Sequence, residues 1–441
     1  MLRSSSRGKL AVRRSRVPVL AIGFVFLVTA CGSTSTGPTA SAPGITATTI
    51  TIGSTQPLTG PAAPGYSEIS KASDAYFQWV NDHGGVNGRK IVYKYEDDGY
   101  NPTNTTSLVR KQVLQDKVFA EFDGLGTPTH LAVVDYLNTE KVPDLFVASG
   151  CNCWNQPSKY PETFGWQPDY TVEGKILGQY INKSLTGKTV GYLSQNDEFG
   201  QDGVKGLDQK IAGSQVVGRQ TYDPAALGVT GVKAQIAALA AAKAQVVVLY
   251  TIPAATALAL LTAASPALNY HPTWVVSSVG ADVTTLTGLL QTFSKGAAGA
   301  ALLEGLVSGG YLPAVSNASD PWITLFQQIH DKYIPSLPMD GNVEYGLAVA
   351  YTFVDLMKKA GQNPTRQDVI NTLNGGSVSR GAGLTPLGYS STSHLGFTGE
   401  QIFLVTGGKA TPQGSVYTST DDGPINTYTG GELTPPGNGI P

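Results

Sequence analysis

Histidine and cysteine are both scarce in this chain of 441 residues, which contains five histidines and three cysteines. Two of the cysteines, Cys151 and Cys153, have no histidine nearby, so a zinc site built from thiolate and imidazole ligands is disfavoured. The chain also lacks the G-x-S-x-G motif of serine hydrolases and the H-E-x-x-H motif of zinc proteases. No nucleophile with a base and an orienting group is recognisable. We therefore expect a protein that performs no catalysis and needs no cofactor or metal.

Long apolar runs are absent after the first thirty residues, so no later segment is expected to span a bilayer. Within those thirty residues, six basic residues and no acidic one accompany an apolar run at 17–28, which is too short for a membrane span of roughly 20 residues. This pattern predicts a signal peptide at residues 1–30. Small residues precede Cys31, and residues 28–31 resemble a bacterial lipobox. The resemblance implies cleavage before Cys31 and attachment of a lipid to its sulfur.

Large apolar side chains are also few in residues 31–47, which are rich in serine, threonine, glycine and proline. Such a segment cannot bury enough apolar surface to repay the entropy of ordering. We therefore expect a lipid-anchored flexible linker. It would hold an exported domain on the outer face of the cell membrane.

Basic residues are in the minority once the signal peptide is removed. All six charges of the signal peptide are positive, so its removal takes away basic residues only. The remaining 24 lysines and arginines face 32 acids, which gives a net charge of about −8. An acidic chain argues against nucleic acid as a partner. About 390 residues remain for folding, and this length predicts two domains.

What the sequence does contain, after residue 48, is an alternation of short β-rich runs and longer helical periodicities. The alternation predicts strands at 49–52, 91–95, 118–122, 145–147, 189–193, 245–250 and 274–277, and helices at 70–82, 103–115, 129–138 and 172–184. Repeated βαβ units of this kind predict an α/β fold with two doubly wound lobes and parallel central sheets. Ligands bind such sheets in the loops at the carboxyl ends of the strands.

One of these loops, residues 124–129, follows a predicted strand and opens a predicted helix. It lacks the third glycine of a dinucleotide fingerprint. Its free N–H groups and the hydroxyls of Thr127 and Thr129 suit a small carboxylate or carbonyl. The same residues also fit a tight turn with a helix cap and no ligand, so both interpretations stay open here. For the acids Asp97 and Asp98, helix capping is favoured over a catalytic carboxylate pair.

Residues 52–60, 80–89 and 97–102, in that order, resemble the leucine/isoleucine/valine-binding family of type I periplasmic binding proteins. Residues 196–201 match the acidic, aromatic-glycine turn of that family's second lobe. The resemblance covers nearly the whole chain after the signal peptide. It implies two lobes joined by a three-crossover hinge, with lobe one at residues 48–172 and 303–398, and lobe two at residues 173–302 and 399–441.

The resemblance also implies where the ligand binds. Thr127, beside Gly126, matches the hydroxyl donor of the family's carboxylate-binding turn. The loop at 149–154 follows the next strand, where the family offers a small residue and a serine or threonine. Tyr66 and Phe199 match aromatic residues that flank the ligand. The expected ligand-binding set is Tyr66, Gly126, Thr127, Cys151, Asn152, Cys153, Phe199, Tyr250 and Asp282.

Two departures from the family pattern bear on the ligand. Amino-acid-binding members hold the ammonium group with an acid after the strand that matches residues 275–280, and here Asp282 is the nearest substitute. The aromatic expected soon after Tyr250 is missing. Because burying an unpaired ammonium costs several kcal/mol, a branched-chain amino acid is the family default, and a carboxylate, an amide or another uncharged polar solute is a serious rival.

The function implied is that of a monomeric solute-binding lipoprotein of an ABC importer, which passes a small molecule to a membrane permease. A ligand-sensing receptor module of the same fold is the alternative, followed by a surface hydrolase. In an oxidising compartment Cys151 and Cys153 can form a disulfide, although the C-x-C spacing is tight.

Overall fold

Alternating isoleucine and threonine begin the first strand of the computed structural model, which describes residues 42–441. In β1 (Thr49–Gln56) the side chains of Ile50 and Ile52 are buried. Residues two apart in a strand point to the same face of the sheet, so both isoleucines face the core. The described residues 42–441 belong to one compact unit with its own hydrophobic core. Cys31 and the predicted signal peptide lie outside the described residues.

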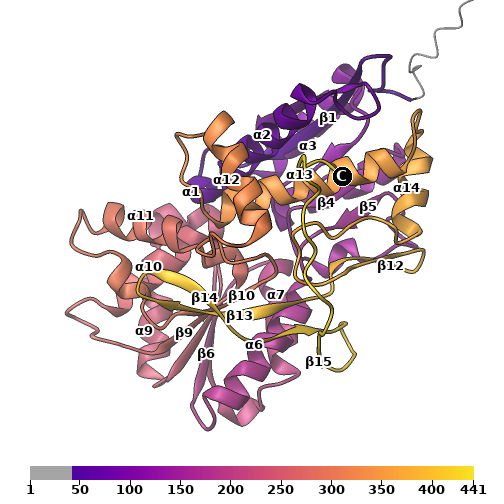
Figure 1. The fold of residues 1–441 in the computed structure, drawn as a ribbon. Coiled ribbons are helices and arrows are strands. Elements are labelled where there is room, and N and C mark those ends of the chain that lie inside the picture. The colour runs from indigo at the N-terminus through magenta and orange to yellow at the C-terminus, as the bar shows by residue number, and fades with distance from the viewer. Residues whose placement is uncertain (1–41) are drawn as a thin grey trace, which may run out of the picture. The chain divides into compact units, whose positions relative to one another are not determined.

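The first sheet of this unit is entirely parallel and has the order β2-β1-β3-β4-β5. Its remaining strands are β2 (Lys90–Asp97), β3 (Glu121–Phe122), β4 (Asp144–Val147) and β5 (Thr163–Gly165). The helices of this lobe are α1 (Ala63–Tyr66), α2 (Ile69–Asp82), α3 (Pro102–Lys111), η1 (Gln112–Asp116), α4 (Thr127–Leu131), α5 (Val134–Thr139), η2 (Asn152–Trp154), α12 (Pro321–Tyr333), α13 (Gly341–Lys359) and α14 (Arg366–Asn374). A short hairpin, β11 (Leu387–Ser390) and β12 (Ser393–Phe397), completes the lobe. Figure 1 shows α2, α12 and α13 grouped on it.

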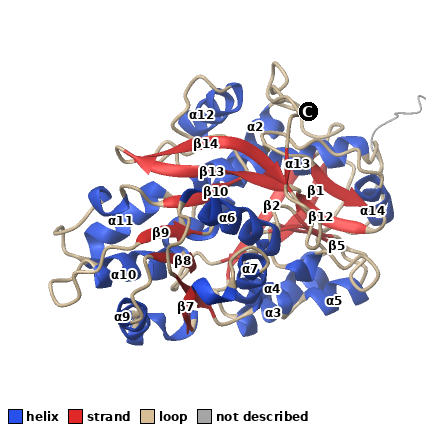
Figure 2. Cartoon of the chain, turned by 90° about the horizontal axis from the view of Figure 1, so that it is seen from below, coloured by secondary structure: helices blue, strands red, loops and turns tan. Residues whose placement is uncertain are grey.

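The second sheet has the order β15-β14-β13-β10-β9-β8-β6-β7. Its parallel part contains β6 (Val190–Gln195), β7 (Val216–Tyr222), β8 (Val246–Tyr250), β9 (Thr273–Val276) and β10 (Val307–Gly310). The strands β13 (Gly399–Thr406), β14 (Lys409–Thr418) and β15 (Asn426–Thr427) add to it in antiparallel fashion, beside β10 (Figure 2). The α/β fold with parallel sheets is thus confirmed, and the antiparallel edge is an addition that the sequence pattern did not predict.

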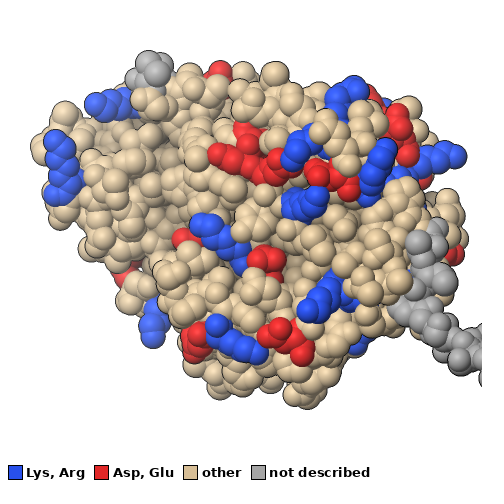
Figure 3. All heavy atoms as spheres, turned by 90° about the horizontal axis from the view of Figure 1, so that it is seen from above, with Lys and Arg blue, Asp and Glu red and all other residues tan. Residues whose placement is uncertain are grey.

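The helices of the second lobe flank this sheet. They are α6 (Tyr170–Ser184), α7 (Glu198–Asp208), η3 (Gly213–Gln215), η4 (Pro224–Ala226), α8 (Leu227–Thr230), α9 (Lys233–Ala241), α10 (Pro253–Ala263), η5 (Ser278–Gly280), α11 (Val283–Phe293) and η6 (Ala300–Leu303). None of the described helices combines the length and the apolar character that crossing a bilayer requires. Acidic and basic side chains are intermingled on the face shown in Figure 3, which lets opposite charges lie close to one another.

Aspartates fix where several of the long helices begin. The side chain of Asp169 accepts a hydrogen bond from Val172 N at the start of α6, and Asp340 accepts from Asn342 N and Val343 N at the start of α13. A short carboxylate at this position satisfies N–H groups that have no partner within the helix. These caps make α6 and α13 begin close to the end of the sheet where the loops gather.

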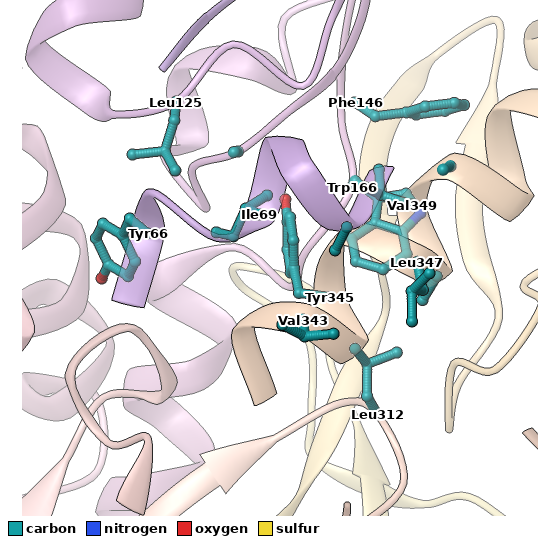
Figure 4. Close-up of a cluster of buried hydrophobic side chains, with 14 of the residues drawn as sticks. Tyr66, Ile69, Leu125, Phe146, Trp166, Leu312, Val343, Tyr345, Leu347 and Val349 are labelled. Carbon is teal, nitrogen blue, oxygen red and sulfur yellow. The ribbon is translucent and has the colours of Figure 1, made fainter. Parts of the chain in front are cut away.

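The chain passes between the two sheets three times, after β5, after β10 and after β12. Each passage contributes one aromatic residue to a common cluster, in which Trp166 and Phe397 are buried and Tyr311 is partly buried. The ring of Trp166 lies 4.9 Å from that of Phe397, and the Phe397 ring lies 5.7 Å from that of Tyr311. Trp166 also packs edge-on against Tyr345 of α13 (Figure 4). The crossovers therefore share one aromatic core.

One crossover and the course of the C-terminal tail differ from those expected. Strand β10 pairs with β9 and β13 of the second sheet, whereas the expected boundary places residues from 303 onward in lobe one. The last residues of the chain also differ, because they return to the first lobe. Tyr76 and Trp79 of α2 donate hydrogen bonds to the carbonyls of Gly439 and Asn438, at 2.7 and 3.1 Å. The Gly-rich sequence of β10 and the irregular tail carry no periodicity from which either course could be predicted.

Candidate ligand-binding cleft

A cleft of about 440 Å³ lies between the two lobes, and the loops that leave the carboxyl ends of the strands line it. The first lobe contributes Tyr66 and Ile69 after β1, Tyr100 after β2, residues 125–127 after β3, Ala148 after β4 and Gln167 after β5. The second lobe contributes Phe199 after β6, Ile252 after β8, residues 278–279 and 281–284 after β9, and residues 311–316 after β10. This is the place where doubly wound sheets bind small molecules.

The loop at 125–127 is held in shape by its backbone and by its own hydroxyl groups. Gly126 has a φ of +108°, and an added Cβ would come within 2.5 Å of both Thr129 and Tyr100. Thr129 donates its hydroxyl to the carbonyl of Leu125 at 2.6 Å, so it supports the turn. The hydroxyl of Thr127 lies 2.6 Å from that of Ser149. Of the two threonine hydroxyls, Thr127 is therefore the one placed to serve a ligand.

Aromatic side chains form much of the wall. Tyr66, Tyr100, Tyr170, Phe199, Tyr345 and Phe403 all line the cleft, and Figure 4 shows Tyr66 and Tyr345 with Ile69 and Leu125. Burial raises the pKa of Tyr66 well above its usual range, so its hydroxyl remains a donor. That hydroxyl donates to the carbonyl of Val279 in the other lobe at 2.6 Å. Tyr66 therefore serves as a contact between lobes as well as a wall of the cleft.

Four residues of the expected set do not line the cleft. Tyr250 lies behind Phe199, with ring centres 5.7 Å apart. Cys151 and Cys153 form a disulfide, and their loop turns away from the cleft. Between them, Asn152 donates its backbone N–H to Asp202 of α7 at 2.8 Å. This loop thus contacts the second lobe rather than the space a ligand would fill.

The disulfide also decides how the two sulfurs can act. The sulfurs lie near a carboxylate oxygen of Asp202, at a spacing that a metal ion could bridge. Because each sulfur is bonded to the other, neither Cys151 nor Cys153 is available as a thiolate ligand.

Carboxylates occupy one end of the cleft, where α11 and α13 begin. Asp282 caps α11 by accepting from Thr285 N at 2.7 Å, and it also accepts from Gly341 N of the other lobe at 3.1 Å. Asp340 and Glu344 of α13 line the cleft beside it. Burial raises the pKa of Asp340 to about 8, and the negative charge of Asp282 adds to this shift.

Comparison with known proteins decides the family. Residues 49–409 match the sequence profile of the periplasmic binding proteins. The chain belongs to the periplasmic binding protein family. Members of this family bind solutes outside the cytoplasm, and an inter-lobe cleft built from strand-end loops is the feature that such a role requires.

Individual periplasmic binding proteins resemble the chain more distantly. A protein named Leu/Ile/Val-binding protein homolog 3, from Brucella melitensis biotype 1, is 24% identical over 161 residues, which are 34% of this chain and 41% of that protein. The match therefore spans about two fifths of the length of this curated relative.

Two solved structures share the fold. A fatty acid ABC transporter substrate-binding protein from Thermomonospora curvata is 23% identical, with a TM-score of 0.74 over 89% of this chain and 99% of that one. A branched chain amino acid ABC transporter protein from Thermus thermophilus with bound valine is 19% identical, with a TM-score of 0.72 over 85% and 97%.

Some cleft residues of this periplasmic binding protein were not expected from its sequence. They include Tyr100, Gln167, Tyr170, Tyr311, Asp340 and Glu344. For Asp340 and Glu344 a signal does exist, because an aspartate followed four residues later by a glutamate begins an apolar helix. That signal marks the start of a helix but says nothing about a cleft, which forms only when the second crossover returns α13 to the first lobe.

Proposed function

We propose that this protein is the extracytoplasmic solute-binding lipoprotein of an ABC importer. The cleft carries this proposal, because loops from both lobes line it and hydrogen bonds join the two lobes beside it. Besides the Tyr66 contact, Asn342 of α13 donates to the hydroxyl of Thr285 at 3.0 Å. A solute that touches both lobes would favour this closed form over an open one.

The walls of the cleft support a small solute with both polar and apolar parts. Thr127 offers a hydroxyl for a carboxylate or carbonyl, while Ile69, Leu125 and Phe199 offer apolar surface. A branched-chain amino acid, or a related carboxylate or amide, combines these features. The relatives named for leucine, isoleucine and valine, and the structure described with bound valine, support the same class.

Partners and location follow from the same proposal. The closed form would be recognised by an ABC permease in the membrane, and the chain would act as a monomer. Cys31, after cleavage of the signal peptide, would carry the lipid that anchors the protein to the outer face of the membrane. The basic residues, the short apolar run and the small residues before Cys31 support this anchoring.

A thermal-shift screen of the compact unit Pro38–Pro441 tests the proposal. The panel would contain amino acids, amides, carboxylates, fatty acids and sugars. A solute present at 100 times its Kd should stabilise the fold by about 2.7 kcal/mol. Stabilisation by one chemical class and its absence with the others is the expected result. If no small solute stabilises the protein, a solute-binding role in this cleft is wrong.

A further inference from the structure

The cleft is larger than a branched-chain amino acid requires. Benzene, a ring of six carbons, fits a cavity of about 150 Å³, and leucine, with half as many non-hydrogen atoms again, needs roughly 220 Å³ on that scale. The cleft has a volume of about 440 Å³. Tyr66 and Asp282 already form hydrogen bonds from one lobe to the other, so further closure is not expected to fill the excess. The space therefore fits a longer solute.

A second cavity adjoins the cleft where the chain leaves β10. Its volume is about 270 Å³, and it lies between the crossover that follows β10, strands β13 and β14, and the C-terminal tail. The residues that line both cavities are Pro313, Ala314, Ser316 and Phe403. The ring of Phe403 lies against Gly310, where an added Cβ would come within 2.5 Å of it. The two cavities therefore meet at this short segment and this ring.

The surface of the second cavity is mainly apolar. Leu384, Pro412 and Leu433 line it, together with the aromatic rings of Trp322 and Phe403. Leu433 is 44% exposed, although most leucines of the chain are buried. An apolar occupant would cover this side chain and remove apolar surface from water, which favours binding.

Several polar side chains around the second cavity are engaged within the protein. Trp322 Nε1 donates to the carbonyl of Leu433 at 2.7 Å, and Gln401 Nε2 donates to the carbonyl of Gly414 at 2.8 Å. A carboxylate oxygen of Asp320 accepts from Trp322 N at 2.8 Å, as a helix cap. No lysine, arginine or histidine is among the described residues that line this cavity. The cavity therefore suits an apolar group better than a charged one.

We propose that the second cavity receives the apolar tail of the solute, whose carboxylate or amide end lies at Thr127. The inference rests on the proposed solute-binding function and narrows its solute class to molecules with a tail longer than an amino-acid side chain. The lining of the cleft extends from Thr127, at the start of α4, to Lys409 and Ala410, at the start of β14. Figure 2 shows α4 and β14 well apart, so a solute that spans the cleft is elongated.

Continuity between the cavities favours a tail over a separate small molecule. A molecule in the second cavity alone would contact Ala314 and Phe403, which a solute in the cleft also reaches. A single elongated solute uses both faces of this junction. Each methylene that it buries beyond the junction should tighten binding by about fourfold.

Calorimetric titration with solutes of increasing length tests the inference. The chain Pro38–Pro441 would be titrated with unbranched monocarboxylates from butanoate to dodecanoate, and with L-leucine. We expect affinity to rise with tail length. Ala314→Leu adds bulk at the junction and should weaken dodecanoate by about tenfold or more, as the lost burial of about two methylenes predicts. Butanoate, whose tail does not reach the junction, should keep its Kd within about twofold.

Two further variants separate this effect from a general disturbance of the segment. Ala318→Leu is the matched control, because Ala318 is exposed and lines neither cavity. It should leave the Kd of both carboxylates within about twofold. Leu433→Ala removes apolar surface on the other side of the second cavity. It should weaken dodecanoate by about fourfold or more and leave butanoate within about twofold. Urea unfolding of each variant checks that it remains folded.

Several results would overturn the inference. Ala314→Leu and Leu433→Ala might change the Kd of butanoate and dodecanoate equally, which would place the tail elsewhere. Saturation with two dodecanoate molecules per chain would assign the second cavity to a separate ligand. Binding of L-leucine, or of another solute without an apolar tail, with no carboxylate longer than butanoate bound, would reject the tail and leave the solute-binding function intact. If no member of the panel binds and the wider screen is also negative, the proposed function fails together with the inference.

Discussion

At the scale of single residues, Thr127 is the side chain on which the proposed site depends most. It follows the strained turn at Gly126, and its hydroxyl is held by Ser149 at the surface of the cleft. Thr127→Ala should weaken solute binding by about 1.5 to 3 kcal/mol, or one to two decades in Kd, because a hydrogen bond to a polar or charged group is lost. Thr127→Ser keeps the hydroxyl and is the control. Calorimetry that finds the alanine variant as tight as the parent would show that this loop is not the site.

Asp340 gives a second prediction at this scale, which concerns stability and pH. Its pKa is about 8 in the fold against an ordinary value of 3.8, so between these values the folded chain binds a proton that the unfolded chain does not. The contribution of Asp340 to stability therefore falls as pH rises from about 4 to about 8 and is constant above that range. Asp340→Asn keeps the cap and removes the titration. Its stability relative to the parent should rise with pH over this window in urea unfolding, and a pH-independent difference would contradict the assignment.

At the scale of elements, some of the helices and most parallel strands could be predicted, because their periodicity is local, whereas α7 and the helices α9 to α14 were not predicted. The expected helices at 70–82, 103–115 and 172–184 overlap α2, α3 and α6. Strand β3 is shorter than expected, since Asp123 turns the chain with a φ of +56° directly after it. Strands β10, β13 and β14 were not predicted. Their pairing depends on crossovers between distant segments, and β10 has two glycines in four residues.

The residues of the candidate site also fall into those that could be predicted from the sequence and those that could not. Tyr66, Thr127, Phe199 and Asp282 could be found because each stands near an ordered family motif, and all four line the cleft. Asp340 and Glu344 could not, since α13 reaches the cleft only through the second crossover. The disulfide loop was expected to face the ligand, yet Asn152 contacts the second lobe, and neighbouring sequence carries no information about which way a loop turns.

The C-terminal tail is an element whose packing can be tested directly. Ile440 is 6% exposed and packs in the core, whereas Leu433 of the same tail is 44% exposed. Ile440→Ala should lower the free energy of unfolding by about 2 to 3 kcal/mol, since burial and packing are lost. Leu433→Ala, a comparable truncation, should cost less than about 0.5 kcal/mol. Equal effects of the two variants in urea unfolding would show that the tail is not docked on the first lobe.

At the scale of the whole molecule, the proposed anchoring predicts a defined chemical product. In the expressed full chain, Cys31 should be the first residue and should carry a diacylglycerol group. Cys31→Ser should abolish acylation and leave an uncleaved or soluble form. Mass spectrometry of the protein from membranes checks both points. Unchanged acylation of the serine variant would exclude Cys31 as the lipid site.

The central claim for the whole molecule is that one solute binds between the lobes and holds them closed. Isothermal titration of Pro38–Pro441 with the solute found by screening tests it most directly. We predict saturable binding of one solute per chain, with markedly weaker binding in a variant that combines Thr127→Ala with Phe199→Ala, one substitution from each lobe. Binding of the same solute with unchanged Kd in that double variant would contradict the claim, because the solute would then lie outside the cleft.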